Sequence, residues 1–424
     1  MMNNLSNMPI LRLTVFVTAL CLAIPTYSQI TLAEYRQSVY AASPELANAA
    51  AAKEQSYSTM RQERTSFLPS LSASGSLKSA LRRSAEGDKF WGFAMQPSIS
   101  QTIYGGGVVR AAFNQAMTGY ESSQYNEQAV MLYMRYAADY AYWNLSAQQL
   151  YKAATDEYVS IIKSLYRVVQ ERFAEGYVAK GDMLQVEARL SDAEYSQLTL
   201  QNNYDVALHS FNNLRSSAQS GDVILLESII DSIPMPRRVT VEELALRRPD
   251  IRMAELAIRS AQWGTKIARS AYNPTISANV SGSWHTFTPN LSNKTYVDGA
   301  AVISLSVPIF HWGERRYAVA RARADERMAE NNLENALDDM LQEEADGWSA
   351  LNNSYSQMQS SLKNLQIAGE NLSISTYSYQ ERQATVLDVL QAQISWIQIY
   401  TNAITARFNY AVAVSAYMRL TAED

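Results

Sequence analysis

The chain is poor in the residues that bind metals and form disulfides. Its 424 residues include one cysteine, Cys21, and three histidines, His209, His285 and His311, that lie far apart in the sequence. No cluster of these residues has the spacing of a metal site, and one cysteine cannot form a disulfide within the chain. These absences predict a chain that holds no metal and no cofactor and is not a thiol enzyme.

An excess of positive charge is also missing. The chain has 36 Lys and Arg residues against 41 Asp and Glu residues, which gives a net charge of −5. Proteins that bind nucleic acids carry a basic excess that neutralises phosphates, so we expect no nucleic-acid partner. Hydrophobic residues make up 47% of the sequence, which excludes intrinsic disorder.

The sequence also lacks a phosphate-binding loop and a catalytic constellation. No lysine follows the glycines at 105–107, so this segment predicts a bend between a strand and a helix. The carboxylates from Asp338 to Asp346, which include Glu343 and Glu344, predict a solvated face of a long helix. Because no nucleophile accompanies an acid or base, the sequence predicts a protein that is not an enzyme.

Long apolar runs are absent beyond the first 28 residues. Arg12 precedes an apolar run from Leu13 to Ile24, which has the length of a signal-peptide core and is too short to span a bilayer. Small residues suit cleavage after Ser28, so residues 1–28 are predicted to be a signal peptide. The alternative is a lipoprotein that keeps Cys21 as its acylated first residue. Any membrane insertion of the mature chain would have to use strands.

Proline is absent from two very long stretches, between residues 98 and 233 and after residue 308. Because proline breaks helices, the stretches at about 107–174 and 313–380 can each form one helix of about 68 residues, about 100 Å long. Further helices are predicted at about 182–215 and 387–420, where apolar residues recur in alternating steps of three and four. This heptad spacing predicts long coiled-coil helices.

The chain is an internal duplication. A shift of about 206 positions places Met183 on Val389, Asp182 on Asp388, and Phe173 on Tyr379. A period of this length indicates two fused copies of one unit rather than a solenoid of short repeats. The predicted divisions are a first repeat at 29–220, a linker at 221–239 and a second repeat at 240–424.

Each repeat carries two segments in which apolar and small polar residues alternate. In one of them Trp91, Phe93, Met95 and Ile99 alternate with glycine, alanine, glutamine and serine. This period of two is typical of membrane-barrel strands, although a soluble antiparallel sheet with one wet face shows it too. The four predicted strands lie at about 67–83, 88–104, 274–287 and 297–310.

Four strands cannot close a barrel in lipid, where open strand edges are not tolerated. Two chains would supply about eight strands around a lumen filled by side chains, whereas three would supply about 12 and leave room for a passage. A pore therefore favours a homotrimer with a shared 12-stranded barrel.

Four segments carry a pattern that is shared with a known family. They are Arg248-Pro249-Asp250-Ile251-Arg252, Asn273-Pro274-Thr275-Ile276-Ser277, Val307-Pro308-Ile309-Phe310 with Gly313, and Tyr379 with Thr385 to Leu390. Their order over essentially the whole mature chain resembles the TolC-type outer-membrane efflux protein (outer membrane factor) family. The resemblance implies a mainly α fold with a small membrane β-barrel, in which three chains form an α-barrel tunnel in the periplasm of a Gram-negative bacterium and a barrel in its outer membrane.

The resemblance also implies partners and a site. The partners would be outer-membrane lipid, a periplasmic adaptor protein and an inner-membrane pump or ABC transporter. The adaptor-contacting tip would comprise two turns, with Gly176, Tyr177, Val178, Lys180 and Gly181 in the first and Arg382, Gln383, Ala384 and Thr385 in the second. The periplasmic gate would comprise Asp388, Tyr379, Asp182 and Gln391.

Threefold symmetry would turn Asp388 into a ring of carboxylates that attracts cations. The family has a second acidic residue where Gln391 stands, and at times a basic residue where Ala384 stands. Plainer interpretations stay open, because an aspartate where a helix begins, such as Asp182 or Asp388, is more often an N-cap. Tyr379 would then be a packing residue.

Two functions follow as hypotheses. The first is a passive exit duct of a tripartite efflux or type I secretion system, gated at its periplasmic tip, whose cargo and pump class stay open. The alternative is an exported coiled-coil scaffold protein that forms no channel. The scaffold predicts a soluble particle, whereas the duct predicts that extraction from the outer membrane needs detergent.

Overall fold

The computed structural model describes residues 29–79, 91–217, 223–286 and 295–423. The predicted signal peptide at 1–28 lies outside the described residues, as do the outer ends of the predicted strands at 80–83, 88–90 and 287. The helices are α1 (Leu32–Ala42), α2 (Pro44–Thr65), α3 (Val108–Ala174), α4 (Lys180–Leu214), α5 (Val241–Arg247), α6 (Pro249–Ser270), α7 (Glu314–Gln380) and α8 (Val386–Leu420). The strands are β1 (Gln29–Ile30), β2 (Ser70–Ser79), β3 (Trp91–Gly105), β4 (Ile224–Leu225), β5 (Thr275–His285) and β6 (Tyr296–Ser306).

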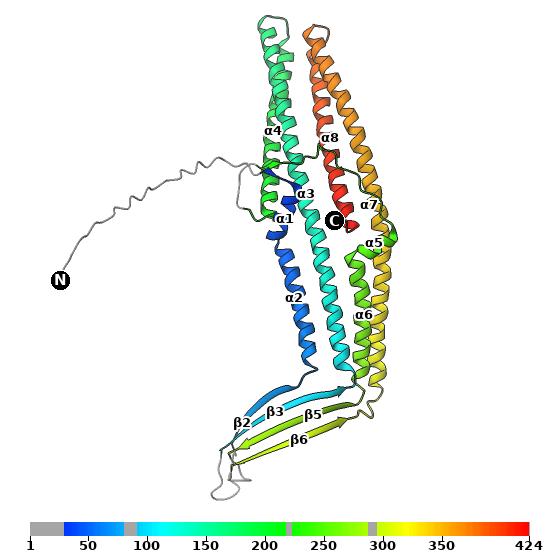
Figure 1. Ribbon diagram of the computed structural model, residues 1–424. Coiled ribbons are helices and arrows are strands. Elements are labelled where there is room, and N and C mark those ends of the chain that lie inside the picture. The colour runs from blue at the N-terminus through cyan, green and yellow to red at the C-terminus, as the bar shows by residue number, and fades with distance from the viewer. Residues whose placement is uncertain (1–28, 80–90, 218–222, 287–294, 424) are drawn as a thin grey trace, which may run out of the picture.

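The molecule is elongated, with a four-stranded sheet at one end and two helical hairpins at the other (Figure 1). The long helices α3 and α7 have 67 residues each, and with α4 and α8 they form the hairpins. The mainly helical fold class is therefore confirmed. None of the described helices combines the length and the apolar character needed to cross a membrane.

The sheet has the strand order β2-β3-β5-β6, and each neighbouring pair is antiparallel. Leu71 lies opposite Ile99, and Ile99 lies opposite Val280, so apolar residues of successive strands share one face. These three residues are 77%, 46% and 53% exposed. Within the described chain β2 and β6 each pair on one side only, so the sheet has two open edges.

The first strand of the sheet starts later than its sequence predicts. β2 begins at Ser70, because the backbone N–H groups of Phe67 and Leu68 still donate to the carbonyls of Arg64 and Thr65 at the end of α2. Phe67 and Leu68 therefore form a short connection between helix and sheet.

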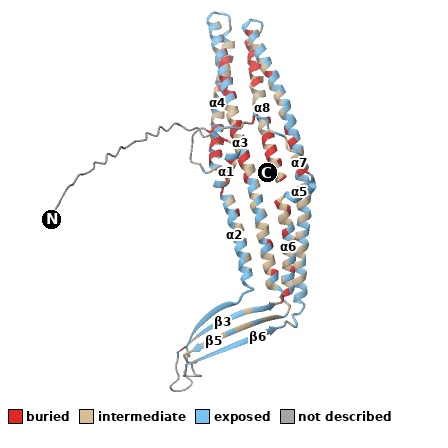
Figure 2. Ribbon diagram, viewed as in Figure 1, coloured by how far each residue is buried: buried red, intermediate tan, exposed pale blue. Residues whose placement is uncertain are grey.

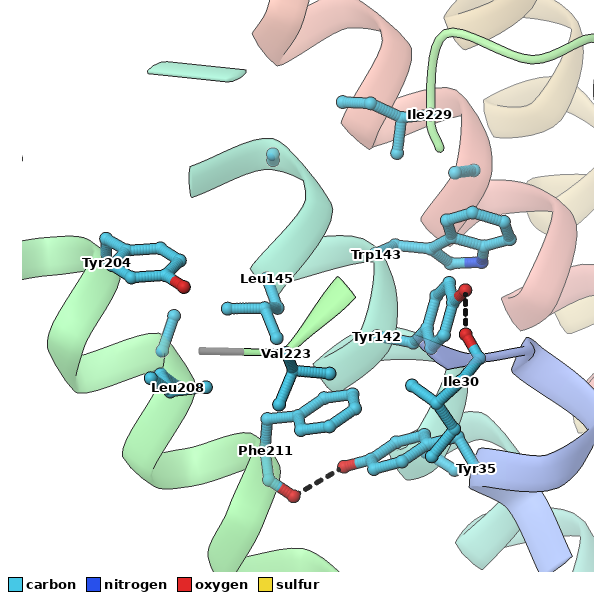
Figure 3. Close-up of a cluster of buried hydrophobic side chains, with 14 of the residues drawn as sticks. Ile30, Tyr35, Tyr142, Trp143, Leu145, Tyr204, Leu208, Phe211, Val223 and Ile229 are labelled. Carbon is cyan, nitrogen blue, oxygen red and sulfur yellow. Dashed lines mark hydrogen bonds between the residues drawn. The ribbon is translucent and has the colours of Figure 1, made fainter. Parts of the chain in front are cut away.

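Buried residues gather in the half of the helices that lies away from the sheet (Figure 2). One apolar cluster lies midway along the molecule, where β1 and β4 pair beside α1, α3 and α4 (Figure 3). The ring of Tyr35 stacks on Phe211 at 3.9 Å between centroids, and its hydroxyl donates to the Phe211 carbonyl at 2.9 Å. The hydroxyl of Tyr142 donates to the carbonyl of Ile30 at 3.1 Å. The segment that starts at Gln29 is thus fixed against the long helix α3.

Candidate functional site

The two turns predicted to form the tip lie at the end of the hairpins that is furthest from the sheet (Figure 1). The first turn joins α3 to α4 and closes α3 with a Schellman motif. In this motif the N–H of Gly176 donates to the carbonyl of Phe173 at 3.0 Å, and the N–H of Tyr177 donates to the carbonyl of Arg172 at 2.8 Å. Gly176 has φ +81°, a left-handed conformation that glycine adopts without strain.

The second turn joins α7 to α8 and repeats this motif with an arginine in place of the glycine. The N–H groups of Arg382 and Gln383 donate to the carbonyls of Tyr379 and Ser378 at 3.1 and 2.7 Å. Arg382 has φ +60°, which costs a residue with a Cβ about 1–2 kcal/mol. Its guanidinium lies 5.6 Å from the ring centroid of Tyr177, so its side chain reaches the first turn. This cation–π contact offsets part of the strain.

A second contact crosses between the hairpins in the opposite direction. The guanidinium of Arg172 on α3 lies 4.6 Å from the ring centroid of Tyr379 on α7. It also donates to the carbonyls of Tyr379 and Gln380 at 3.4 and 3.5 Å. Tyr379 is 7% exposed, and its hydroxyl has no hydrogen-bond partner among the described residues. Two arginines, one from each repeat, therefore hold the two turns together.

Asp388 belongs to the N-terminal cap of α8. Its N–H donates to the Thr385 hydroxyl at 3.3 Å, and the hydroxyl and N–H of Thr385 donate to its carboxylate at 2.7 and 2.8 Å. In this capping box the N-cap residue is Thr385, so the plainer interpretation of Asp388 as the N-cap is wrong in its position. The hydrogen bonds from the side chain and then the backbone of Thr385 hold the pKa of the exposed Asp388 carboxyl below its usual value.

A groove of about 470 Å³ runs between the two turns. The predicted residues that line it are Tyr177, Val178, Asp182, Tyr379, Arg382, Ala384 and Thr385. The other predicted residues, Gly176, Lys180, Gly181, Gln383, Asp388 and Gln391, are exposed and do not line it. Asp182 has the position in α4 that Asp388 has in α8, but the N-cap there is Ala179, which makes no side-chain cap. No group of three or more His, Cys, Asp or Glu residues in the described part of the chain could hold a metal.

Arg172 and Glu175 line the groove as well and are not among the residues predicted from the sequence. No local signal marks them, because the contact of Arg172 depends on the two hairpins lying side by side. Ala384 supplies no positive charge to the groove, whereas Arg172 brings one to Tyr379 from the other repeat.

Solved structures share this fold. The chain superposes on CusC with a TM-score of 0.81 at 17% identity, covering 92% of this chain and 91% of that chain. It superposes on the Campylobacter jejuni CmeC outer membrane channel with a TM-score of 0.76 at 21% identity, covering 92% and 85%. The chain therefore shares with these outer membrane proteins a fold of two long helical hairpins carried on a four-stranded sheet.

The sequence identifies the family. The sequence model of the outer membrane efflux protein family matches residues 36–216 and 240–423, one match in each repeat. The chain is also similar to outer membrane protein TolC of Escherichia coli (strain K12), at 22% identity over 416 residues that cover 92% of this chain and 83% of TolC. The chain belongs to the outer membrane efflux protein family, and its location is the outer membrane of a Gram-negative bacterium.

Proposed function

We propose that the chain is the exit duct of a tripartite efflux or type I secretion system, a passive homotrimeric channel that is gated at its periplasmic tip. The sheet is the observation that carries this proposal, since it exposes an apolar face and has two open edges. An apolar face suits contact with outer-membrane lipid, where every strand edge has to be paired. Three copies would close a barrel of about 12 strands, and the helices would continue it as a periplasmic tunnel.

The two turns are proposed as the gate and as the contact for a periplasmic adaptor. The exposed Asp388 would form a threefold ring of carboxylates, and Gln391 one helical turn later would add no charge. Tyr379 and Asp182 line the groove between the hairpins, so a change in the spacing of the hairpins would alter their contacts directly. Gly176, Lys180, Gly181 and Gln383 are exposed on the turns, where an adaptor could reach them.

Transport through such a duct needs energy from a partner. We propose that the chain catalyses nothing and uses no cofactor, and that an inner-membrane pump or ABC transporter delivers the cargo through the adaptor. The scaffold alternative is less favoured because Trp91 and Ile303 of the sheet are 58% and 75% exposed. A soluble particle would hold this apolar face in water.

Membrane fractionation tests the proposal. We expect the mature chain in the outer-membrane fraction, released by detergent but not by high salt or alkaline carbonate, and purified with the mass of three copies. Recovery of the chain from the periplasm without detergent would contradict the duct and support the scaffold.

Neutralising the carboxylate of Asp388 is expected to reduce the cation preference of the channel in planar bilayers. The pKa of this carboxyl is lowered, so its charge is present above the usual aspartate pKa of about 3.9 and is lost as the pH falls through the lower value. Asp388→Asn should reduce the preference at neutral pH. Thr385→Val, which removes the hydroxyl bonded to Asp388, should move the loss of preference to higher pH.

Asp192→Asn is the matched control, because Asp192 is an exposed carboxylate on α4 away from the turns. Equal selectivity in Asp388→Asn and Asp192→Asn would remove Asp388 from the gate.

A further inference from the structure

Trp312 projects from the connection between β6 and α7. It is 88% exposed, and its φ of +48° is a left-handed conformation that is strained for a bulky residue. The ring of Phe310, which is 67% exposed, lies 4.8 Å from the indole at an interplanar angle of 67°. The neighbouring His311 instead packs edge-on against Tyr272 of its own chain at 5.8 Å. Within the described part of the chain the Phe310 ring contacts the indole, yet Trp312 keeps 88% of its surface exposed.

A cavity of about 1340 Å³ lies at the opposite edge of the sheet, beside the start of β2. Phe67 and Leu68 give it an apolar wall, and Arg61, Arg64 and Arg110 bring three positive charges. None of the described residues that line it is acidic. Apolar walls with guanidinium groups are the surroundings in which an indole ring is well held.

The topology of the sheet brings these two features together between copies. Neighbouring strands alternate in direction, so β2 of one copy would pair antiparallel with β6 of the next copy. β2 begins at the helical end of the sheet, and β6 ends there. The connection that contains Trp312 would therefore lie beside Phe67 and Leu68 of the next copy.

The chain contains an internal equivalent of this joint, by which we mean the place where one strand ends beside the start of the next at the helical end of the sheet. The internal joint lies between the end of β3 and the start of β5. There Gly106 packs on the end of α6, and its carbonyl accepts a hydrogen bond from the Asn273 side chain at 2.8 Å. A Cβ at Gly106 would lie 2.6 Å from the Ser270 carbonyl oxygen, so the internal joint has no room for a side chain. The duplication places Gly106 on Trp312 and Asn273 on Leu68. The joint between copies thus has an indole where the internal joint has a glycine, and it has a cavity to receive that indole.

We propose that Trp312 of one copy inserts into the cavity beside Phe67 and Leu68 of the next copy, with the arginines of the cavity against its ring. The contact would close the ring of subunits at the level where the barrel meets the tunnel. This inference rests on the proposed trimer, and its partner is a second copy of this chain.

Cysteine cross-linking tests the contact in the outer membrane. The mature chain is predicted to lack cysteine, so Leu68→Cys with Trp312→Cys introduces one pair. Within one chain the two positions lie at opposite edges of four strands, roughly 14 Å apart at about 4.8 Å per strand, too far for a disulfide. Oxidation should give bands of two and three copies, whereas Tyr195→Cys with Trp312→Cys should give none. An intact trimer without cross-linked bands would overturn the proposal.

Trp312→Gly removes the indole without harming the fold of the single chain, because glycine adopts the positive φ at this position without strain. We expect the temperature at which the detergent-solubilised trimer dissociates to fall by several degrees. Phe67→Ala should lower this dissociation temperature too. In the double variant the dissociation temperature should fall by less than the sum of the two single decreases. An unchanged dissociation temperature, with only membrane insertion impaired, would overturn the proposal and assign the aromatic pair to lipid. A wild-type chain that neither trimerises nor conducts would instead contradict the proposed function itself.

Discussion

Arg36→Ala is expected to lower the free energy of unfolding by about 3–5 kcal/mol, because it leaves a buried carboxylate without its partner. Arg36 on α1 binds Asp139 on α3 with two hydrogen bonds, at 2.6 and 2.8 Å. The Asp139 side chain is 3% exposed, so water cannot replace the guanidinium. The measurement is urea or thermal unfolding of the detergent-solubilised protein, followed by the loss of helical circular dichroism.

Two variants control this prediction. Arg36→Met with Asp139→Leu removes both charges and should be much less harmful than the single change. Lys163→Ala breaks an ion pair with Glu194 whose side chains are 52% and 46% exposed, so it should cost less than about 1 kcal/mol. An Arg36→Ala variant as stable as Lys163→Ala would show that the Arg36–Asp139 pair does not fix α1 to α3.

Arg172→Ala is expected to raise the single-channel conductance at least about twofold by loosening the tip. A cation–π contact contributes about 0.5–2 kcal/mol, so three copies of the Arg172–Tyr379 contact would bias the gate by about 1.5–6 kcal/mol. Arg382→Gly should act less strongly, because it removes the contact with Tyr177 but also relieves the strained backbone of the second turn.

The comparison variants separate the ring contact from charge and from the hydroxyl. Tyr379→Phe should conduct like wild type, since the Tyr379 hydroxyl has no partner among the described residues. Arg167→Ala removes an exposed arginine from the same helix and should also change nothing. Equal conductance in Arg172→Ala and Arg167→Ala would exclude the contact between hairpins from the gate.

The long helices and the fold class could be predicted because their signals are local. Missing prolines allow a helix, and heptad spacing within one segment shows which face it buries. The pairing of β1 with β4 could not be predicted, because each strand has two residues and they lie far apart in the sequence. Strands this short carry no period that alternation could reveal.

The carboxylates from Asp338 to Asp346, predicted to form a solvated face, also include a contact between residues far apart in the sequence that no local pattern reveals. Glu344 is 5% exposed, so that prediction is wrong for this residue. Arg238 binds it from the linker at 2.8 and 2.9 Å, and the hydroxyl of Tyr417 donates to it at 3.3 Å. At the offset of 206 that relates both ends of α3 and α7, Glu344 corresponds to Ala138 and not to the buried Asp139. The duplication therefore gives no signal for the burial of Glu344, and its partner Arg238 lies 106 positions away in the sequence.

The position of the tip could be predicted, but its contacts could not. The two turns are marked by the ends of the helical pattern, and Thr385 with Asp388 three residues later is a recognisable capping box. Arg172 and Tyr379 belong to different repeats, and their contact exists only because the hairpins pack side by side.

Single-channel recording of the detergent-purified chain, after its mass has been shown to be that of three copies, tests the duct most directly. A gated trimeric exit duct predicts small, cation-selective currents that are closed most of the time and rise in Arg172→Ala. A chain that stays in solution without detergent and never inserts into the bilayer would contradict the account, because its four strands would not form part of a membrane barrel.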